Sequence, residues 1–182
     1  MNYSFFGTCS NDHNQLFGCL RTILNQTISP KEIILVNSGD SNIELEIGNM
    51  INEEKIKFVY LHKKLTRVES LNLALDKSTA DYSFRFDTRT RFSKDYAEKA
   101  LKVLKDKNLK NSVVGGVPLA VSECNKFESK VCAEIMNSSY LFFFPKHRNL
   151  NYSGYASSIY LGCFETSILK DIKFNEKEAL LS

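Results

Sequence analysis

Short apolar runs alternate with segments of helical periodicity along the first half of the chain, and this alternation limits the fold more than any other feature. The runs that predict buried strands are residues 3–9, 33–36, 56–61 and 82–86. The second run is continuously apolar and rich in β-branched residues, which is typical of a strand covered on both faces. Strands that alternate with helices form a mostly parallel sheet between helical layers, with the carboxyl ends of the strands at one edge. We therefore expect an α/β/α sandwich.

Apolar spacing and capping residues predict the helices between these strands. The first helix ends before Pro30 and buries the stripe Leu16, Leu20, Ile23 and Leu24. The second buries Ile43, Ile47, Met50 and Ile51. Thr66 and Glu69 have the spacing of a capping box, so a third helix starts there and buries Val68, Leu71 and Leu75.

The second half of the chain carries further patterns. Ser93 is expected to cap a helix with the inward side chains Tyr96, Ala100, Val103 and Leu104. Residues 113–117 predict a fifth strand, and Phe127, Val131 and Ile135 have the spacing of a further helical stripe. The apolar run 140–144 is interpreted as core, as an oligomer face or as an acceptor surface. Order is expected to return over residues 158–164, followed by a short helix from Glu165.

Polar residues follow the predicted strands where the strands end. Asn11 follows the first strand, Asn37 and Ser38 follow the second, and Asp87 ends the fourth. Open α/β sheets bind ligands in the crevice beyond the carboxyl ends of their strands, so we expect these side chains to line one crevice. For Asp87 the alternative is a structural role, in which it caps the next helix or pairs with a neighbouring arginine.

Bulk properties exclude several classes of protein. At 182 residues the chain has room for one core, and we expect a single domain spanning residues 1–182. A net charge of +3, with both signs interspersed, does not indicate nucleic-acid binding. The five cysteines lack metal-ligand spacing and read as small apolar residues in a reducing compartment. No signal peptide or membrane span is predicted, so the expected location is the cytoplasm, either free or at the inner face of the membrane.

Several segments, taken in order, resemble family 2 glycosyltransferases of the GT-A fold, a Rossmann-like nucleotide-diphospho-sugar transferase fold. The segments that carry the resemblance are residues 8–11, 23–27, 32–41, 70–75 and the Asp87 strand. The continuation over residues 85–96, with 115–116 and 160–164, is most similar to the succinoglycan-type bacterial enzymes that build exopolysaccharide. The resemblance covers essentially the whole chain.

The resemblance implies a nucleotide-sugar donor, commonly a UDP-sugar, and transfer with inversion to a polysaccharide or lipid-linked acceptor. It implies the donor-binding residues Thr8, Ser10, Asn11, Asn37, Ser38, Arg67, Asn72, Arg85, Asp87 and Arg89. In the family, an acidic motif after the fourth strand holds Mg²⁺ or Mn²⁺, which neutralises the departing diphosphate, and here Asp87 would be the ligand. A later carboxylate serves as general base.

This chain departs from the family pattern in three places. Asn37 stands where the family has an aspartate that accepts a hydrogen bond from the nucleobase, and Arg89 replaces the second acid of the metal motif. The chain ends at Ser182, before the segment that carries the catalytic base, which leaves Glu176 and Glu178 as the only nearby acids. The alternative function is therefore a catalytically impaired nucleotide-sugar-binding or scaffold module, either a homo-oligomer or a subunit that needs a partner chain.

Arg89 and Arg91 have two interpretations. They are either solvated surface cations or guanidinium groups that contact the diphosphate and take over part of the role of the lost metal carboxylate. A divalent metal held by Asp87 and phosphate oxygens alone stays compatible with the sequence.

Overall fold

The computed structural model describes residues 2–51, 56–105, 111–122, 124–138, 149, 152–156 and 158–176. The chain divides into two compact units, one made of residues 1–114 and 161–182 and the other of residues 115–160.

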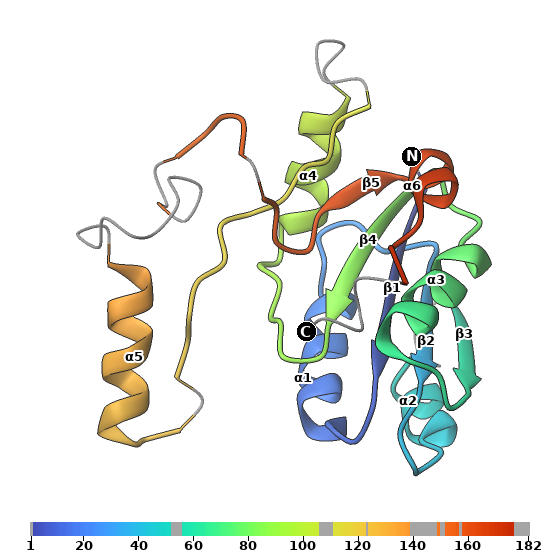
Figure 1. Ribbon diagram of the computed structural model, residues 1–182, viewed down its shortest axis with the longest axis horizontal. Coiled ribbons are helices and arrows are strands. Elements are labelled where there is room, and N and C mark those ends of the chain that lie inside the picture. The colour runs from blue at the N-terminus through green and yellow to red at the C-terminus, as the bar shows by residue number, and fades with distance from the viewer. Residues whose placement is uncertain are drawn as a thin grey trace. The chain divides into compact units, whose positions relative to one another are not determined.

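The first unit is built on a five-stranded sheet with the order β3-β2-β1-β4-β5 (Figure 1). The strands are β1 (Tyr3–Cys9), β2 (Glu32–Asn37), β3 (Lys57–His62), β4 (Tyr82–Asp87) and β5 (Cys163–Glu165). Neighbouring pairs among β1 to β4 are parallel, as the alternation of strands and helices predicts, and the predicted mostly parallel α/β class is confirmed. β5 pairs antiparallel with β4, so the prediction that all strands end at one edge is wrong for this strand.

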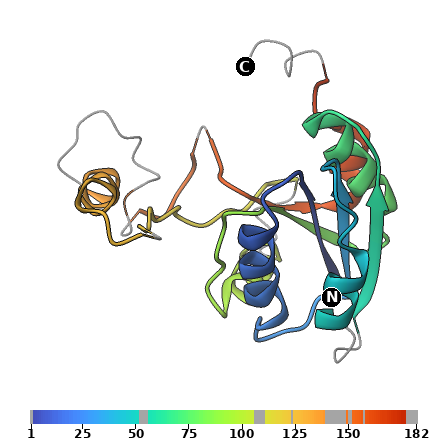
Figure 2. The same cartoon turned by 90° about the horizontal axis from the view of Figure 1, so that it is seen from below.

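Helices cover both faces of this sheet. The side chains of α1 (His13–Leu24), α2 (Glu44–Ile51) and α4 (Tyr96–Leu104) pack with Phe5, Leu35 and Phe84 on one face. The side chains of α3 (Arg67–Lys77) and α6 (Thr166–Ile172) pack with Phe6 and Ile34 on the other. Figure 2 shows α1 on one side of the strands and the α3/α6 pair on the other. Successive residues of a strand point to opposite faces, which explains why Phe5 and Phe6 belong to different cores.

Some sequence-based expectations for the later elements are wrong. Residues 113–117 form no strand: Val114 makes an isolated bridge to Cys163, with backbone hydrogen bonds in both directions. In α4 the N-cap is Asp95 and not Ser93, and Leu101 is buried while Val103 is 44% exposed. The rest of the predicted inward face is confirmed, because Ala100 is buried and Tyr96 and Leu104 pack against the same core.

The second unit contains α5 (Phe127–Asn137). The carboxamide of Asn137 exchanges two hydrogen bonds with the backbone of Ala120, each 2.8 Å long, which ties the end of the helix to the preceding segment. The helix predicted from the stripe of Phe127, Val131 and Ile135 is confirmed, although no side chain of α5 is buried. The predicted apolar run 140–144 lies outside the described residues.

Across the ranges that the structure describes, no helix combines the length and the apolar character needed to cross a membrane.

Candidate functional site

The loops after β1, β2 and β4 meet at the carboxyl edge of the sheet. The Asn11 carboxamide donates to the Asp40 carboxylate at 3.2 Å and accepts from the Asp40 amide at 3.1 Å, which joins the first two loops. The Thr88 hydroxyl donates to the Asp12 carboxylate, which joins the loop after β4 to the loop after β1. The sequence prediction that these loops converge is therefore confirmed.

Gly39 permits the close approach of the first two loops. A Cβ atom at this position would lie 2.3 Å from the carbonyl oxygen of Ser10. Ser38 adds further contacts, because its amide and its hydroxyl both donate to the carbonyl of Cys9. Ser10 itself is exposed at this edge, and its amide donates to Asp12.

The side chains of Asn37 and Asp87 lie on opposite faces of the sheet. Asp87 is in register with Thr8 on β1, two residues beyond Phe6, so both side chains point to the face covered by α3. Asn37 follows Val36, which packs on that same face, so the Asn37 side chain points to the α1 and α2 face. The three loops share one edge, but the expectation that Asn11, Asn37 and Asp87 line one crevice is wrong for Asn37, whose side chain does not face that of Asp87.

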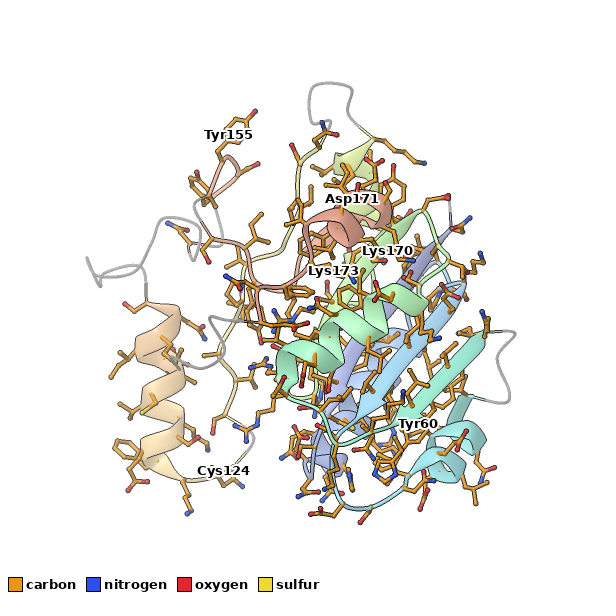
Figure 3. The ribbon with its side chains drawn as sticks, turned by 45° about the vertical axis from the view of Figure 1, so that its right-hand side comes forward. Tyr60, Cys124, Tyr155, Lys170, Asp171 and Lys173 are labelled. Atoms are coloured by element: carbon orange, nitrogen blue, oxygen red, sulfur yellow. The ribbon has the colours of Figure 1, made fainter. Side chains whose placement is uncertain are left out.

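The carboxamide of Asn37 is buried and bonded within the protein. Its oxygen accepts from the Gly39 amide at 2.8 Å, and its nitrogen donates to the Ser41 carbonyl at 2.7 Å. The same nitrogen donates to the hydroxyl of Tyr60, which is labelled on β3 in Figure 3. In this structure Asn37 therefore shapes the loop after β2, and its expected contact with a nucleobase stays a prediction.

Asp87 lies between two guanidinium groups. Arg67 Nη2 is 2.9 Å from Asp87 Oδ1, and Arg85 Nη2 is 3.1 Å from Oδ1 and 3.3 Å from Oδ2. The side chains of Arg85 and Asp87 are 24% and 21% exposed, while that of Arg67 is 63% exposed. The predicted pairing of Asp87 with a neighbouring arginine thus occurs, and the partners are Arg85 and the distant Arg67.

The capping box predicted at Thr66 and Glu69 is confirmed and fixes the position of Arg67. Thr66 is the N-cap of α3, and the reciprocal hydrogen bonds of the box are both present. The hydrogen bonds from Thr66 lower the pKa of Glu69, so the carboxylate stays ionised in the box. Arg67 is therefore the first residue of a helix whose start is well defined.

Arg89 and Arg91 differ in their surroundings. Arg91 Nη1 lies within hydrogen-bond distance of the carbonyls of Gln15, Thr88 and Thr90, so this side chain ties the loop to α1. Arg89 is exposed. Partial burial opposes ionisation of Asp12, but hydrogen bonds from Thr88 and Ser10 and the charge of Arg89 outweigh it and lower the pKa of Asp12.

Asn72 holds the segment after α6 against the α3 face. Its Nδ2 donates to the Phe174 carbonyl at 3.0 Å and to Glu176 Oε1 at 3.1 Å, and its Oδ1 accepts from the Phe174 amide at 2.9 Å. Glu176 is thereby placed beside α3, whereas Glu178 lies outside the described residues. Because Asn72 is 6% exposed, its carboxamide acts as an internal clamp in this structure.

Phe174 is a site residue that the sequence reasoning missed. The Arg85 guanidinium carbon lies 5.7 Å from the centroid of its ring, and the ring also contacts Phe6 at 6.2 Å between centroids. Lys173, with a φ of 58°, turns the chain just before it. The contact joins residues far apart in the sequence, so no local pattern indicates it.

The residues around Asp87 do not fit a divalent metal. The described part of the chain holds no group of three or more histidine, cysteine, aspartate or glutamate residues that could hold an ion. Both oxygens of Asp87 already accept hydrogen bonds from guanidinium groups, whose positive charges repel a second cation nearby. The predicted second ligand position is occupied by Arg89, which cannot ligate.

The sheet order, the crossover helices and the polar loops at the carboxyl edge define an α/β domain of the nucleotide-binding kind. The sequence model of glycosyl transferase family 2 matches residues 8–165. The chain therefore belongs to glycosyltransferase family 2. A search among curated protein sequences found no match.

Solved structures of transferases share the fold. TarS residues 1–349 from S. aureus in complex with UDP superposes with a TM-score of 0.62 at 16% identity, over 97% of this chain and 51% of that one. The complex of the same protein with UDP-GlcNAc gives a TM-score of 0.59 at 16% identity, over 96% and 49%. The mannosyltransferase PcManGT from Pyrobaculum calidifontis, in complex with GDP-Man and Mn²⁺, gives 0.54 at 18% identity, over 64% and 35%. The GT-A fold is thus confirmed, and this chain spans about half the length of the TarS 1–349 chain.

Proposed function

We propose that the chain binds a nucleoside diphosphate sugar, with UDP as the nucleotide, at the carboxyl edge of β1, β2 and β4. The observation that carries this proposal is the cluster of Thr8, Arg67, Arg85 and Asp87 beside three converging polar loops. A sugar diphosphate needs hydrogen-bond donors for its phosphates and polar loops for its base and ribose, and this edge offers both. Support for UDP comes from TarS, a structural neighbour whose complexes contain UDP and UDP-GlcNAc.

The base and ribose are assigned to the loops after β1 and β2. Ser10, Asn11 and Ser38 supply exposed or half-exposed polar groups there. The hydrogen bonds between Asn11 and Asp40 hold the two loops together, and those from Lys64 and Asn11 lower the pKa of Asp40 and keep it ionised. The diphosphate is assigned to the arginines around Asp87.

The reaction proposed is transfer of the sugar with inversion to a hydroxyl of a polysaccharide or lipid-linked acceptor. The acceptor oxygen forms the new bond to the anomeric carbon, and the bond from that carbon to the diphosphate breaks with its electron pair going to the nucleoside diphosphate. A carboxylate takes the acceptor proton, and Glu176 is our candidate because Asn72 holds it beside the α3 face. A succinoglycan-type role in the bacterial cytoplasm is part of this proposal.

Calorimetric titration with UDP, GDP, UDP-GlcNAc and GDP-mannose, followed by an assay for released nucleoside diphosphate, tests the proposal. Binding of a uridine nucleotide together with slow release of UDP supports a transferase. Binding without release in the presence of saccharide acceptors favours the alternative, a nucleotide-sugar-binding module. If none of the four ligands binds, the proposal is wrong. Arg21→Ala, an exposed position on the last turn of α1, serves as the control variant.

A further inference from the structure

The arginines around Asp87 suggest a donor site that differs from a carboxylate and metal site. We propose that Asp87 is a positioning residue that orients Arg67 and Arg85, and that these two guanidinium groups bind the diphosphate without a divalent metal. The inference rests on the function proposed above, because it assigns residues to the diphosphate of the same donor. It differs from the sequence expectation, in which Asp87 is itself the metal ligand.

The charges of the cluster favour an anion. Two guanidinium groups and one carboxylate leave a net charge of +1, and Arg89 in the following loop adds a further exposed cation. Each guanidinium group has five N–H donors, and the contacts with Asp87 use only those of Nη2 on each arginine. Donors that can bind phosphate oxygens therefore remain on both arginines. Guanidinium groups suit phosphate because they donate pairs of parallel hydrogen bonds.

The cluster is held in place from two sides. Asp87 fixes the Nη2 end of Arg85, while the ring of Phe174 lies 5.7 Å from its guanidinium carbon. Phe174 is in turn held through its backbone by Asn72. An arginine that is already oriented loses less conformational entropy when it binds a ligand, so this arrangement favours affinity.

The start of α3 does not itself provide the anion site. The capping box already satisfies backbone donors of its first turn, because the Thr66 hydroxyl accepts from the Glu69 amide and the Glu69 carboxylate accepts from the Thr66 amide. The Glu69 carboxylate also brings negative charge to that turn. The side chain of Arg67, and not the helix end, is therefore the group that presents positive charge.

Titration of uridine and UDP, in EDTA and in MnCl₂, tests the inference with wild type, Arg67→Ala, Arg67→Lys and Asp87→Asn. We expect wild type to bind UDP with the same affinity in EDTA and in MnCl₂. Arg67→Ala should weaken UDP binding about tenfold or more in both conditions and leave uridine binding unchanged, because uridine has no phosphates. Arg67→Lys should recover only part of the loss, since lysine lacks the planar fork.

Asp87→Asn separates the two roles of this residue. If Asp87 positions the arginines, the substitution weakens UDP binding to the same degree with and without MnCl₂ and spares uridine binding. If Asp87 is a metal ligand, wild type binds UDP only with MnCl₂, and Asp87→Asn loses this metal-dependent binding. That result overturns the inference and leaves the proposed function standing. Absence of UDP binding in every condition overturns both. Arg21→Ala should match wild type throughout, and circular dichroism establishes that each variant is folded.

Discussion

Replacing Asn72 by alanine should destabilise the first unit and release the segment after α6. The carboxamide makes three hydrogen bonds, two to the Phe174 backbone and one to Glu176. A hydrogen bond of this kind contributes about 0.5–1.5 kcal/mol net. Phe174 is only half-buried and Glu176 is exposed, so water replaces part of what is lost. Two such bonds to the Phe174 backbone contribute about 1–3 kcal/mol together. We therefore expect the free energy of unfolding to fall by about 2 kcal/mol, the middle of this range.

Urea denaturation, followed by circular dichroism, measures this change. A loss of about 2 kcal/mol corresponds to a fall of roughly 4–8 °C in the melting temperature for a chain of this length. Hydrogen exchange adds a local readout, because the Phe174 amide loses its acceptor and should exchange faster. Asn49→Ala, at an exposed position of α2, is the matched control and should stay within about 0.5 kcal/mol of wild type.

Two results would refute this reasoning. One is an Asn72→Ala variant whose unfolding free energy lies as close to wild type as that of the control. The other is unchanged exchange at the Phe174 amide, which would mean that the clamp does not hold this segment. Asn72→Asp gives a second check: it keeps an acceptor for the Phe174 amide but loses both donated bonds and faces the Glu176 carboxylate. It should be destabilised as well.

Three further predictions concern stability. Thr66→Ala removes the N-cap of α3 and should cost about 1 kcal/mol in urea denaturation. Glu32→Ala should cost about 1–3 kcal/mol, because the buried Glu32 carboxylate accepts from the Thr79 amide and leaves that donor unpaired when it is removed. Burial raises the pKa of Cys9 and of Cys19 from 9.0 to about 12, so both thiols stay neutral in the folded state while the unfolded chain ionises. The contribution of these two thiols to stability should therefore be constant well below pH 9, and it should fall as the pH rises from 9 toward 12 by about 1.4 kcal/mol per pH unit for each thiol.

Each of these predictions has a result that contradicts it. An unfolding midpoint of Thr66→Ala equal to wild type would mean that the capping box is not formed in solution. For Glu32→Ala the comparison is Lys57→Met, which removes only a half-exposed partner of Glu32 and should cost less than about 1 kcal/mol. Equal losses in the two variants would show that the Thr79 amide is not the important contact. Unchanged urea stability between pH 8 and pH 10 would mean that the two thiols are not buried.

The sequence alone predicted the central sheet, because β1, β2 and β4 are strongly apolar and their boundaries carry turn residues. The capping box at Thr66 was predictable for a similar reason, since its signal lies within four residues. Local patterns of this kind depend on the backbone geometry of one element and need no knowledge of the rest of the chain.

Contacts between distant parts of the chain were not predictable. β5 is three residues long, and its antiparallel direction depends on its pairing with β4 and not on its own composition. The clamp joins Asn72 to Phe174, which lie 102 positions apart. The edges of the buried face of α4 likewise depend on its neighbours: Leu101 is buried and Val103 is exposed against expectation, whereas Ala100 is buried as predicted.

The candidate site was predictable in its location but not in its chemistry. The sequence placed Asn11, Asn37 and Asp87 at one edge, but the opposite faces of the last two follow from the strand register and from the packing of Phe6 and Val36. The pairing of Asp87 with Arg67 needed the structure, because Arg67 belongs to a helix that returns to this edge from another part of the chain.

Backbone amide NMR of the labelled protein titrated with UDP tests most directly whether the carboxyl edge of the sheet binds a nucleoside diphosphate. We expect the amides of Ser10, Gly39 and Thr88 to shift together with one affinity. An open hollow of about 500 Å³ lies at the opposite edge of the sheet, and Thr79 and Asp81 are among the residues that line it. We expect the amides of these residues to stay unchanged. Shifts confined to that hollow, or no shifts at the three loops, would contradict the account.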